Sequence, residues 1–266
     1  MTSFPPAAGC FRLVLLLLLA GAGALRADWQ DELSPIEPGG FPPLRPVTLE
    51  YQCGWAAMTA GRVETQFSRT ADDTCLLDAT AATTGLVRAL WRIDATHEAK
   101  GDLTSLMPLA VHQTEVYRAQ TINTHLDFDG EGVERLRQST SDKNPARRKR
   151  FKFDNLRDLQ TAILYVRSQK LESGATYRMV VYPGTAAYLA TVTVLGRERI
   201  KVEAGSYPAI KLDLQLEKVT KDMKLTAQGK FKHGTAWLSD DADRLPLKMD
   251  AQLFVGSVWV ELAKVD

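Results

Sequence analysis

Three aspartates near the end of this sequence stand close enough together to do chemistry. Asp240, Asp241 and Asp243 lie in the segment WLSDDADRLP, between two apolar stretches. Paired carboxylates could supply a general acid and a general base for a hydrolase, or oxygen ligands for a cation. Aspartate and serine also favour tight turns, because their side chains accept hydrogen bonds from nearby backbone N–H groups. A calcium loop would continue with a glycine and further ligands, but Leu245 follows. We therefore favour a turn, in which Arg244 offsets the negative charge.

Other reactive motifs are incomplete. The pair His97-Glu98 begins H-E-x-x-H, but position 101 is glycine, so the zinc-protease motif fails. The glycines before Ser206 and Ser257 lack the spacing of the G-x-S-x-G nucleophile elbow. The remaining histidines, His112, His125 and His233, are scattered along the chain. We expect no catalytic residues, no metal and no cofactor.

The charge balance gives no reason to expect nucleic acid as a partner. The formal net charge is +1, which provides little electrostatic attraction for a polyanion. The one strongly basic run, Arg147-Arg148-Lys149-Arg150, lies in a polar segment, residues 138–150, and we expect it to form a solvated loop.

The first residues predict a secretory signal peptide, residues 1–27. The apolar run Leu13–Leu25 is shorter than the roughly 18 residues that cross a bilayer. The small residues after it fit cleavage after Ala24 or Ala27. We expect an exported protein of the bacterial periplasm or envelope, with no transmembrane segment in the mature chain.

Proline and glycine dominate the next segment, which reads SPIEPGGFPPLRP from Ser34 to Pro46. Such a composition excludes helices and central strands, so residues 28–47 are expected to form an extended arm. Residues 48–266 change to short segments rich in valine, threonine and leucine, separated by turn formers, and we expect one β-rich domain. Apolar and polar residues alternate along Ile210–Glu217, which predicts a strand with one solvent-exposed face. Asp129-Gly130 and Pro183-Gly184 predict turns.

One long helix is expected between Asp154 and Gly174. Leu156, Leu159, Ile163 and Val166 recur at helical spacing, and Asp154 or Asn155 could cap the helix start. A shorter helix is expected over residues 84–91. About eleven strands and these helices predict a mainly β fold, a strongly curved antiparallel sheet or partial β-barrel with the long helix packed against it. A single strand is expected from Pro246 to Val260, with Gly256 marking a bulge or bend.

Export would permit a disulfide between Cys53 and Cys75, but the expected strand geometry disfavours one. A meander over residues 49–58, 61–68 and 73–80 places Cys53 opposite a residue near Phe67, and Cys75 opposite one near Ser68. The two thiols would then lie two strands apart, at about 10 Å, beyond the roughly 7 Å limit for bridging.

Motifs along the chain resemble one family of exported bacterial proteins, the domain-of-unknown-function family 3108. They are Leu49-x-Tyr51-x-x-Gly54-Trp55, Ala60-Gly61, Leu164-Tyr165-x-Arg167, Leu171-x-x-Gly174 and a closing motif that contains Trp237, Ser239, Asp240, Asp241, Arg244, Pro246 and Gly256. The resemblance implies an envelope location and a β-rich fold, and it carries over no catalytic residue. We expect the closing motif to be structural.

The leading functional hypothesis is a non-enzymatic envelope protein. A curved sheet with a helix across one face is similar in outline to periplasmic lipoprotein carriers, which hold acyl chains in an apolar concavity, an analogy at the level of the fold. The sheet would bind an apolar ligand such as a lipid, or dock to an envelope partner. The alternatives are a structural or assembly protein of the envelope, and a hydrolase that uses Asp240, Asp241 or Asp243.

Overall fold

The computed structural model describes residues 28–142, 146–227, 231–253 and 256–266. Ser34–Asp266 forms one compact unit, and the residues before Ser34 form a separate one. In that separate unit, the short 3-10 helix η1 (Trp29–Glu32) is capped by Asp28. The expected signal peptide, residues 1–27, lies outside the described residues.

Fifteen strands make up a single sheet. In the first half of the chain they are β1 (Val47–Trp55), β2 (Met58–Arg69), β3 (Thr74–Thr83), β4 (Ile93–Asp102), β5 (Pro108–Tyr117), β6 (Thr121–Phe128), β7 (Gly132–Ser139) and β8 (Arg147–Lys152). In the second half they are β9 (Thr176–Val181), β10 (Ala187–Val202), β11 (Gly205–Val219), β12 (Leu225–Ala227), β13 (Phe231–Ser239), β14 (Pro246–Leu253) and β15 (Gly256–Val265).

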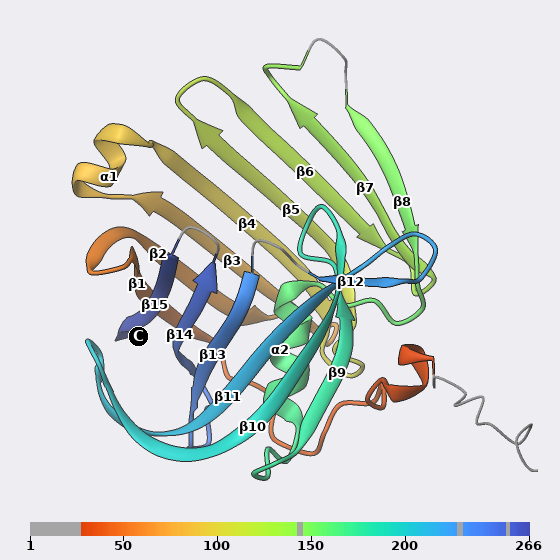
Figure 1. The fold of residues 1–266 in the computed structure, drawn as a ribbon, viewed down its shortest axis with the longest axis vertical. Helices are drawn as coiled ribbons and strands as arrows, with labels where there is room; N and C mark the ends of the chain where they lie inside the picture. Colours follow the sequence, from red (N-terminus) through yellow and green to blue (C-terminus); the bar gives the residue numbers. More distant parts are fainter. Residues whose placement is uncertain (1–27, 143–145, 228–230, 254–255) are drawn as a thin grey trace, which may run out of the picture. The chain divides into compact units, whose positions relative to one another are not determined.

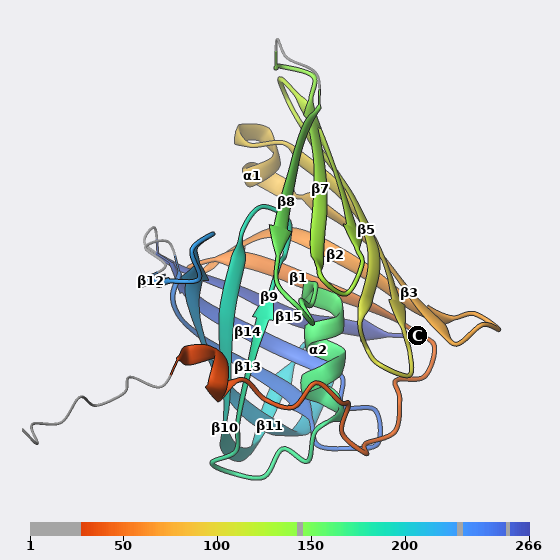
Figure 2. The same cartoon turned by 90° about the vertical axis from the view of Figure 1, so that its right-hand side faces the viewer.

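The sheet is antiparallel and open, in agreement with the predicted mainly β class. Its order is β8-β7-β6-β5-β4-β3-β2-β1-β15-β14-β13-β11-β10-β9, with β12 paired to β11. Neighbours in the first half are therefore also neighbours in the chain, and β15 joins that half to the second. Register shifts in β1, β10 and β13 mark bulges, which bend strands and increase their twist. Figures 1 and 2 show the strongly curved sheet with helix α2 on its inner side.

Alternating side chains explain which face of the sheet is inside. In β1, Val47, Leu49 and Tyr51 are buried, while Thr48 and Glu50 are only partly covered. The inner residues of β1 pack with Phe67 and with residues of the later strands in one core cluster, which includes Leu247 and Leu262. A second cluster joins α2 to the other half of the sheet through Tyr165, Met179, Val192, Ile210 and Leu238.

Helix α2 (Leu159–Ser168) has ten residues, and the expected long helix is not confirmed. Its N-cap is Asp158, not Asp154 or Asn155, and a threonine at the third helical position completes a capping box. The predicted apolar face is partly wrong, because Leu156 and Val166 are buried as expected but the other two residues are not. Leu159 is 53% exposed and Ile163 is 38% exposed, whereas Leu164, Tyr165 and Val166 are buried. The short helix α1 (Gly85–Leu90) confirms the prediction for residues 84–91.

Two further predictions about the chain path are wrong. The basic run does not form a loop, because Arg147–Lys152 forms β8, a strand at the edge of the sheet that pairs with β7. Pro246–Val260 does not form one strand either, because β14 ends at Leu253 and a separate strand, β15, begins at Gly256 and pairs antiparallel with β14. The hairpin predicted at Asp129-Gly130 is confirmed between β6 and β7.

The cysteine geometry is partly as expected. Cys53 pairs with Gly61 on β2, so the predicted partner near Phe67 is wrong, whereas Cys75 pairs with Arg69, next to the predicted Ser68. The cysteines lie on β1 and β3, with β2 between them, and both thiols are free.

Candidate functional site

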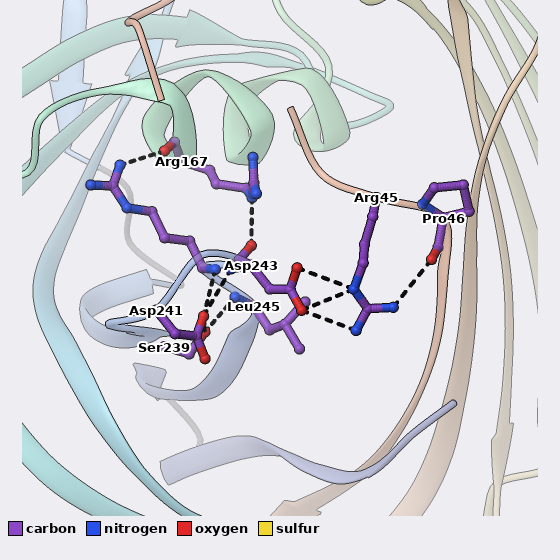
Figure 3. Close-up of polar contacts among 8 residues, drawn as sticks. Arg45, Pro46, Arg167, Ser239, Asp241, Asp243 and Leu245 are labelled. Carbon is purple, nitrogen blue, oxygen red and sulfur yellow. Dashed lines mark hydrogen bonds and ion pairs between the residues drawn. The ribbon is translucent and has the colours of Figure 1, made fainter. Parts of the chain in front are cut away.

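The closing motif forms the connection between β13 and β14. Ser239 Oγ donates a hydrogen bond of 2.7 Å to Asp241 Oδ1. The same carboxylate oxygen accepts hydrogen bonds from the backbone N–H groups of Asp243, at 2.9 Å, and Arg244, at 3.0 Å. The backbone N–H of Leu245 donates to Ser239 Oγ at 2.8 Å (Figure 3). Ser239 and Asp241 thus satisfy the backbone of a tight connection.

The other two aspartates form ion pairs with separate partners. Asp240 contacts Arg197 Nε at 2.9 Å, and Asp243 contacts Arg45 Nη2 at 3.0 Å. Each carboxylate of the cluster therefore has a different partner. This geometry stabilises the turn and gives no paired acid and base.

Arg244 connects this turn to the end of α2. Its Nη1 donates to the carbonyl of Arg167 at 2.8 Å and also to that of Gln169. The last carbonyls of a helix have no partner within the helix, and a cation there also favours the helix dipole. The Arg244 side chain lies over the ring of Phe41, in the proline-rich arm, with 3.4 Å between the guanidinium carbon and the ring centroid.

Two more buried arginines bind the arm. Arg167 donates to the carbonyl of Asp243 at 2.8 Å and to that of Pro42 at 2.6 Å. Arg157 donates to the carbonyl of Ile36 at 2.7 Å and lies over the ring of Tyr165, at 4.2 Å. Burial lowers the pKa of Arg157 and that of Arg167 to about 10, so both remain charged at neutral pH. The arm, α2 and the β13–β14 turn thus form one cross-linked unit.

Sequence reasoning placed Arg167 and Arg244 in motifs but missed Arg157 and Phe41. The available signal was Phe41, the one aromatic residue in the proline- and glycine-rich segment Ser34–Pro46. Backbone contacts with β13 and α2 depend on the fold and could not be read from spacing.

The other motif residues lie nearby without joining the aspartates. Trp237 is buried on β13 and donates from Nε1 to Glu198 Oε1 at 2.6 Å. Pro246 begins β14, and its carbonyl accepts a hydrogen bond of 3.0 Å from Tyr51. Gly256 begins β15 with φ +121, and a Cβ atom there would lie 2.9 Å from Trp55 Nε1. Gly256 therefore allows both the reversal and the close approach of Trp55.

The histidines do not converge. His97 Nδ1 lies 2.9 Å from the Gln113 amide, His125 pairs with Asp127, and His233 pairs with Asp213. His112 packs edge to face with His125, with 5.8 Å between ring centroids. Among the described residues, no group of three or more His, Cys, Asp or Glu side chains could hold a metal ion.

Small residues line the inner face of the central strands beyond the core. Val63 pairs with Ala81, and Ala81 pairs with Ala95, so their side chains form one row across β2, β3 and β4. All three are only partly buried. Ala79 on β3 and Gly61 on β2 lie on the same face, in neighbouring rows. The row Val63, Ala81 and Ala95 is thus short-chained and apolar, and it continues onto β5 at Glu115.

A groove of about 620 Å³ lies over β1 to β5. Its lining includes charged residues, the threonine row Thr80, Thr96 and Thr114, and also Val63, Ala81 and Ala95. Its charges have partners within the protein. Glu50 pairs with Lys264, and hydrogen bonds from Arg88 and Arg92 hold the pKa of Asp94 at about 2.

These features define an open, barrel-like antiparallel sheet with an internal helix. The chain belongs to the family described as protein of unknown function DUF3108, whose model matches residues 50–263. The resemblance found in the sequence is therefore confirmed. No curated protein is significantly similar to this chain in sequence.

Solved structures with a similar fold share very little sequence. A β-barrel-like protein of the domain-of-unknown-function family DUF1849 from Brucella abortus has a TM-score of 0.55 and 10% identity, and covers 85% of this chain and 98% of its own. A Bacteroides fragilis protein described as exported, with a YmcC-like fold, has a TM-score of 0.37 and 7% identity, with coverages of 86% and 99%. A Parabacteroides distasonis protein described as a lipoprotein has a TM-score of 0.32 and 5% identity, and the match covers 86% of this chain and 99% of that protein. Only the first similarity supports the fold.

Proposed function

We propose that this chain is an exported, non-enzymatic protein of the bacterial envelope whose inner sheet face binds an apolar ligand, such as a lipid acyl chain. One observation carries the proposal. The row Val63, Ala81 and Ala95 is apolar, faces the inside of the curve and stays partly exposed. Apolar surface left open to water favours an apolar occupant, because burying it releases about 25 cal/mol per Å².

The closing motif supports this proposal by its structural use. Ser239, Asp241 and Arg244 bond to the backbone of the turn or of α2. Their contacts hold α2 and the arm against one end of the inner face. In this proposal, the motif maintains the curvature of the sheet, and no residue in it performs chemistry.

Adjacent alanines on β3 provide the test. Ala81 faces inward with Val63, whereas Ala82 points to the opposite face of the strand, and both are half-buried. The chain is incubated with phosphatidylethanolamine and phosphatidylglycerol vesicles, recovered, and measured by native mass spectrometry. We expect lipid adducts on the wild type and on Ala82→Trp, and their loss in Ala81→Trp, whose indole would fill the inner space. Bare wild-type protein, or equal adducts on both variants, would contradict the proposal.

Export has its own experiment. Within the described ranges, no helix has both the length and the apolar character needed to cross a bilayer. If residues 1–27 direct export, the protein recovered from an envelope fraction begins at Leu25 or Asp28, as N-terminal sequencing would show. A chain that begins at Met1 and stays with the cytoplasmic fraction would exclude this part of the proposal.

A further inference from the structure

Large apolar side chains gather at one rim of the sheet, which we call the α1 rim. Leu86 is 72% exposed, Leu90 58% and Trp91 62%. Trp55 and Met58, which face each other across the β1–β2 turn, are 40% and 50% exposed. Single exposed apolar residues are ordinary, but a group of five on neighbouring segments marks an interaction surface.

The segments of the α1 rim are held together by backbone contacts. The N–H of Thr84, just before α1, donates to the carbonyl of Ala60 at 2.9 Å, and α1 packs beside β2. Arg118, after β5, donates to the carbonyl of Ala89 at 2.8 Å. In Figure 1, α1 lies at the far end of β3 and β4, away from α2. The rim is therefore a fixed surface of the sheet, remote from the arm and the β13–β14 turn.

Positive charge surrounds the apolar residues. Arg88 and Arg92 both pair with Asp94, at 2.7 and 2.9 Å. Arg92 remains 54% exposed at its side chain, and Arg118 is also exposed. Arg88 and Arg92 thus share one carboxylate, which leaves a net positive charge beside α1. Tryptophan, leucine and arginine together are the residues that occupy the interfacial layer of membranes, where indoles sit at headgroup depth and cations meet lipid phosphates.

We propose that the α1 rim docks onto a lipid bilayer, with its tryptophan and leucine side chains in the interfacial layer and its arginines against lipid phosphates. Arginines near an anionic surface add electrostatic attraction to the burial of the apolar side chains. A protein partner would match the apolar residues equally well but gives no reason for the surrounding excess of arginine. The inference concerns the outer rim, and it holds whether or not the inner face carries a ligand.

Hydrogen exchange on the full chain tests the docking locally. Because exchange is read segment by segment, binding of the apolar run Leu13–Leu25 to lipid does not obscure it. With vesicles of phosphatidylethanolamine and phosphatidylglycerol, we expect slower exchange over residues 55–60 and 84–92. The double variant Leu86→Ser/Leu90→Ser and the single variant Trp91→Ser should lose this slowing. The matched control Leu195→Ser, at a site 53% exposed on β10, should keep it.

The outcomes separate the alternatives. All substituted side chains are exposed, so the urea midpoints should match the wild type and exclude unfolding as the cause. Unchanged exchange at the rim, or slowing that survives in both rim variants, would overturn the inference. Slowing that follows protein concentration without vesicles would also overturn it, because it would identify a second copy of the chain as the partner. Lipid adducts on the inner face are measured separately with Ala81→Trp, so either proposal can fail alone.

Discussion

The guanidinium carbon of Arg244 lies 3.4 Å from the centre of the Phe41 ring, although the two residues are separated by most of the chain. The same guanidinium donates to the carbonyls at the end of α2. One side chain therefore joins the arm, the helix and the β13–β14 turn. Its planar shape is what allows it to stack and to donate in several directions at once.

Arg244→Lys should destabilise the protein by about 2 kcal/mol, because lysine keeps the charge but loses the stacking and most of the hydrogen bonds. Arg45→Lys is the matched control, since its ion pair with Asp243 is 51% exposed on the arginine side and should contribute less than about 1 kcal/mol. The free energy of unfolding in urea measures both. Equal losses would show that the contacts of Arg244 contribute no more than a surface pair.

Within the aspartate cluster, the structure ranks the residues. Asp241→Ala should cost about 1–2 kcal/mol, because Asp241 Oδ1 accepts two backbone N–H groups and the Ser239 hydroxyl. Asp241→Asn keeps that acceptor and should cost less. Asp240→Ala removes only a partly exposed ion pair with Arg197 and should stay within about 0.5 kcal/mol. Urea unfolding gives the ranking, and loss of cellular function in Asp240→Ala at wild-type stability would instead indicate chemistry.

Asp158 should make stability depend on pH. Its Oδ1 caps α2 by accepting the N–H of Thr161 at 2.7 Å, while its buried Oδ2 has no hydrogen-bond partner among the described residues. Burial raises the pKa of Asp158 above the ordinary value of about 3.9. Between the two pKa values the folded state holds more protons than the unfolded state, so this group lowers stability as pH rises.

Asp158→Asn removes that titration and retains an oxygen for the cap. The free energy of unfolding of the variant, minus that of the wild type, should therefore increase from about pH 4 upward and level off above the raised pKa. Urea unfolding across a pH series measures the difference. Parallel curves for the two proteins would show that Asp158 ionises in the folded state as freely as in water.

The two described cysteines should differ in reactivity. Cys75 is 2% exposed and its Sγ lies 3.4 Å from the Gly101 carbonyl, whereas Cys53 is half-buried. Burial raises the pKa of both thiols, which lowers the reactive thiolate fraction. Iodoacetamide should label Cys53 in the folded protein and Cys75 only after unfolding, as peptide mass mapping would show. Failure to label either thiol in urea without reductant would reveal a disulfide.

Local patterns in the sequence predicted those parts of the fold that local chemistry decides. The alternation of apolar and polar residues along Ile210–Glu217 identified part of strand β11. Asp129-Gly130 identified a hairpin, because Gly130 adopts the positive φ of +84 that such a turn needs. The start of α2 was missed because several residues there can cap a helix. Asn155 instead takes φ +60, and its N–H bonds to the Gly130 carbonyl, a contact distant in sequence.

Long-range pairing accounts for the other errors. The basic run forms strand β8 because it pairs with β7, where Arg148 meets Glu134 at 2.9 Å. Half of the apolar stripe of α2 was misassigned because Leu164, Tyr165 and Arg167 are buried in its place. Leu159 and Ile163 remain exposed. Spacing alone could not distinguish these two faces of a helix that is apolar on both.

The place of β15 in the sheet has a consequence for assembly. The strand formed by Gly256–Val265 lies between β1 and β14, so its pairings hydrogen-bond the β1–β8 half of the sheet to the half that ends in β14. A chain lacking those ten residues has no strand that pairs with both halves of the sheet, however much of each half has formed. Formation of each half and the joining of the two halves are therefore separable steps, and the joining requires Gly256–Val265.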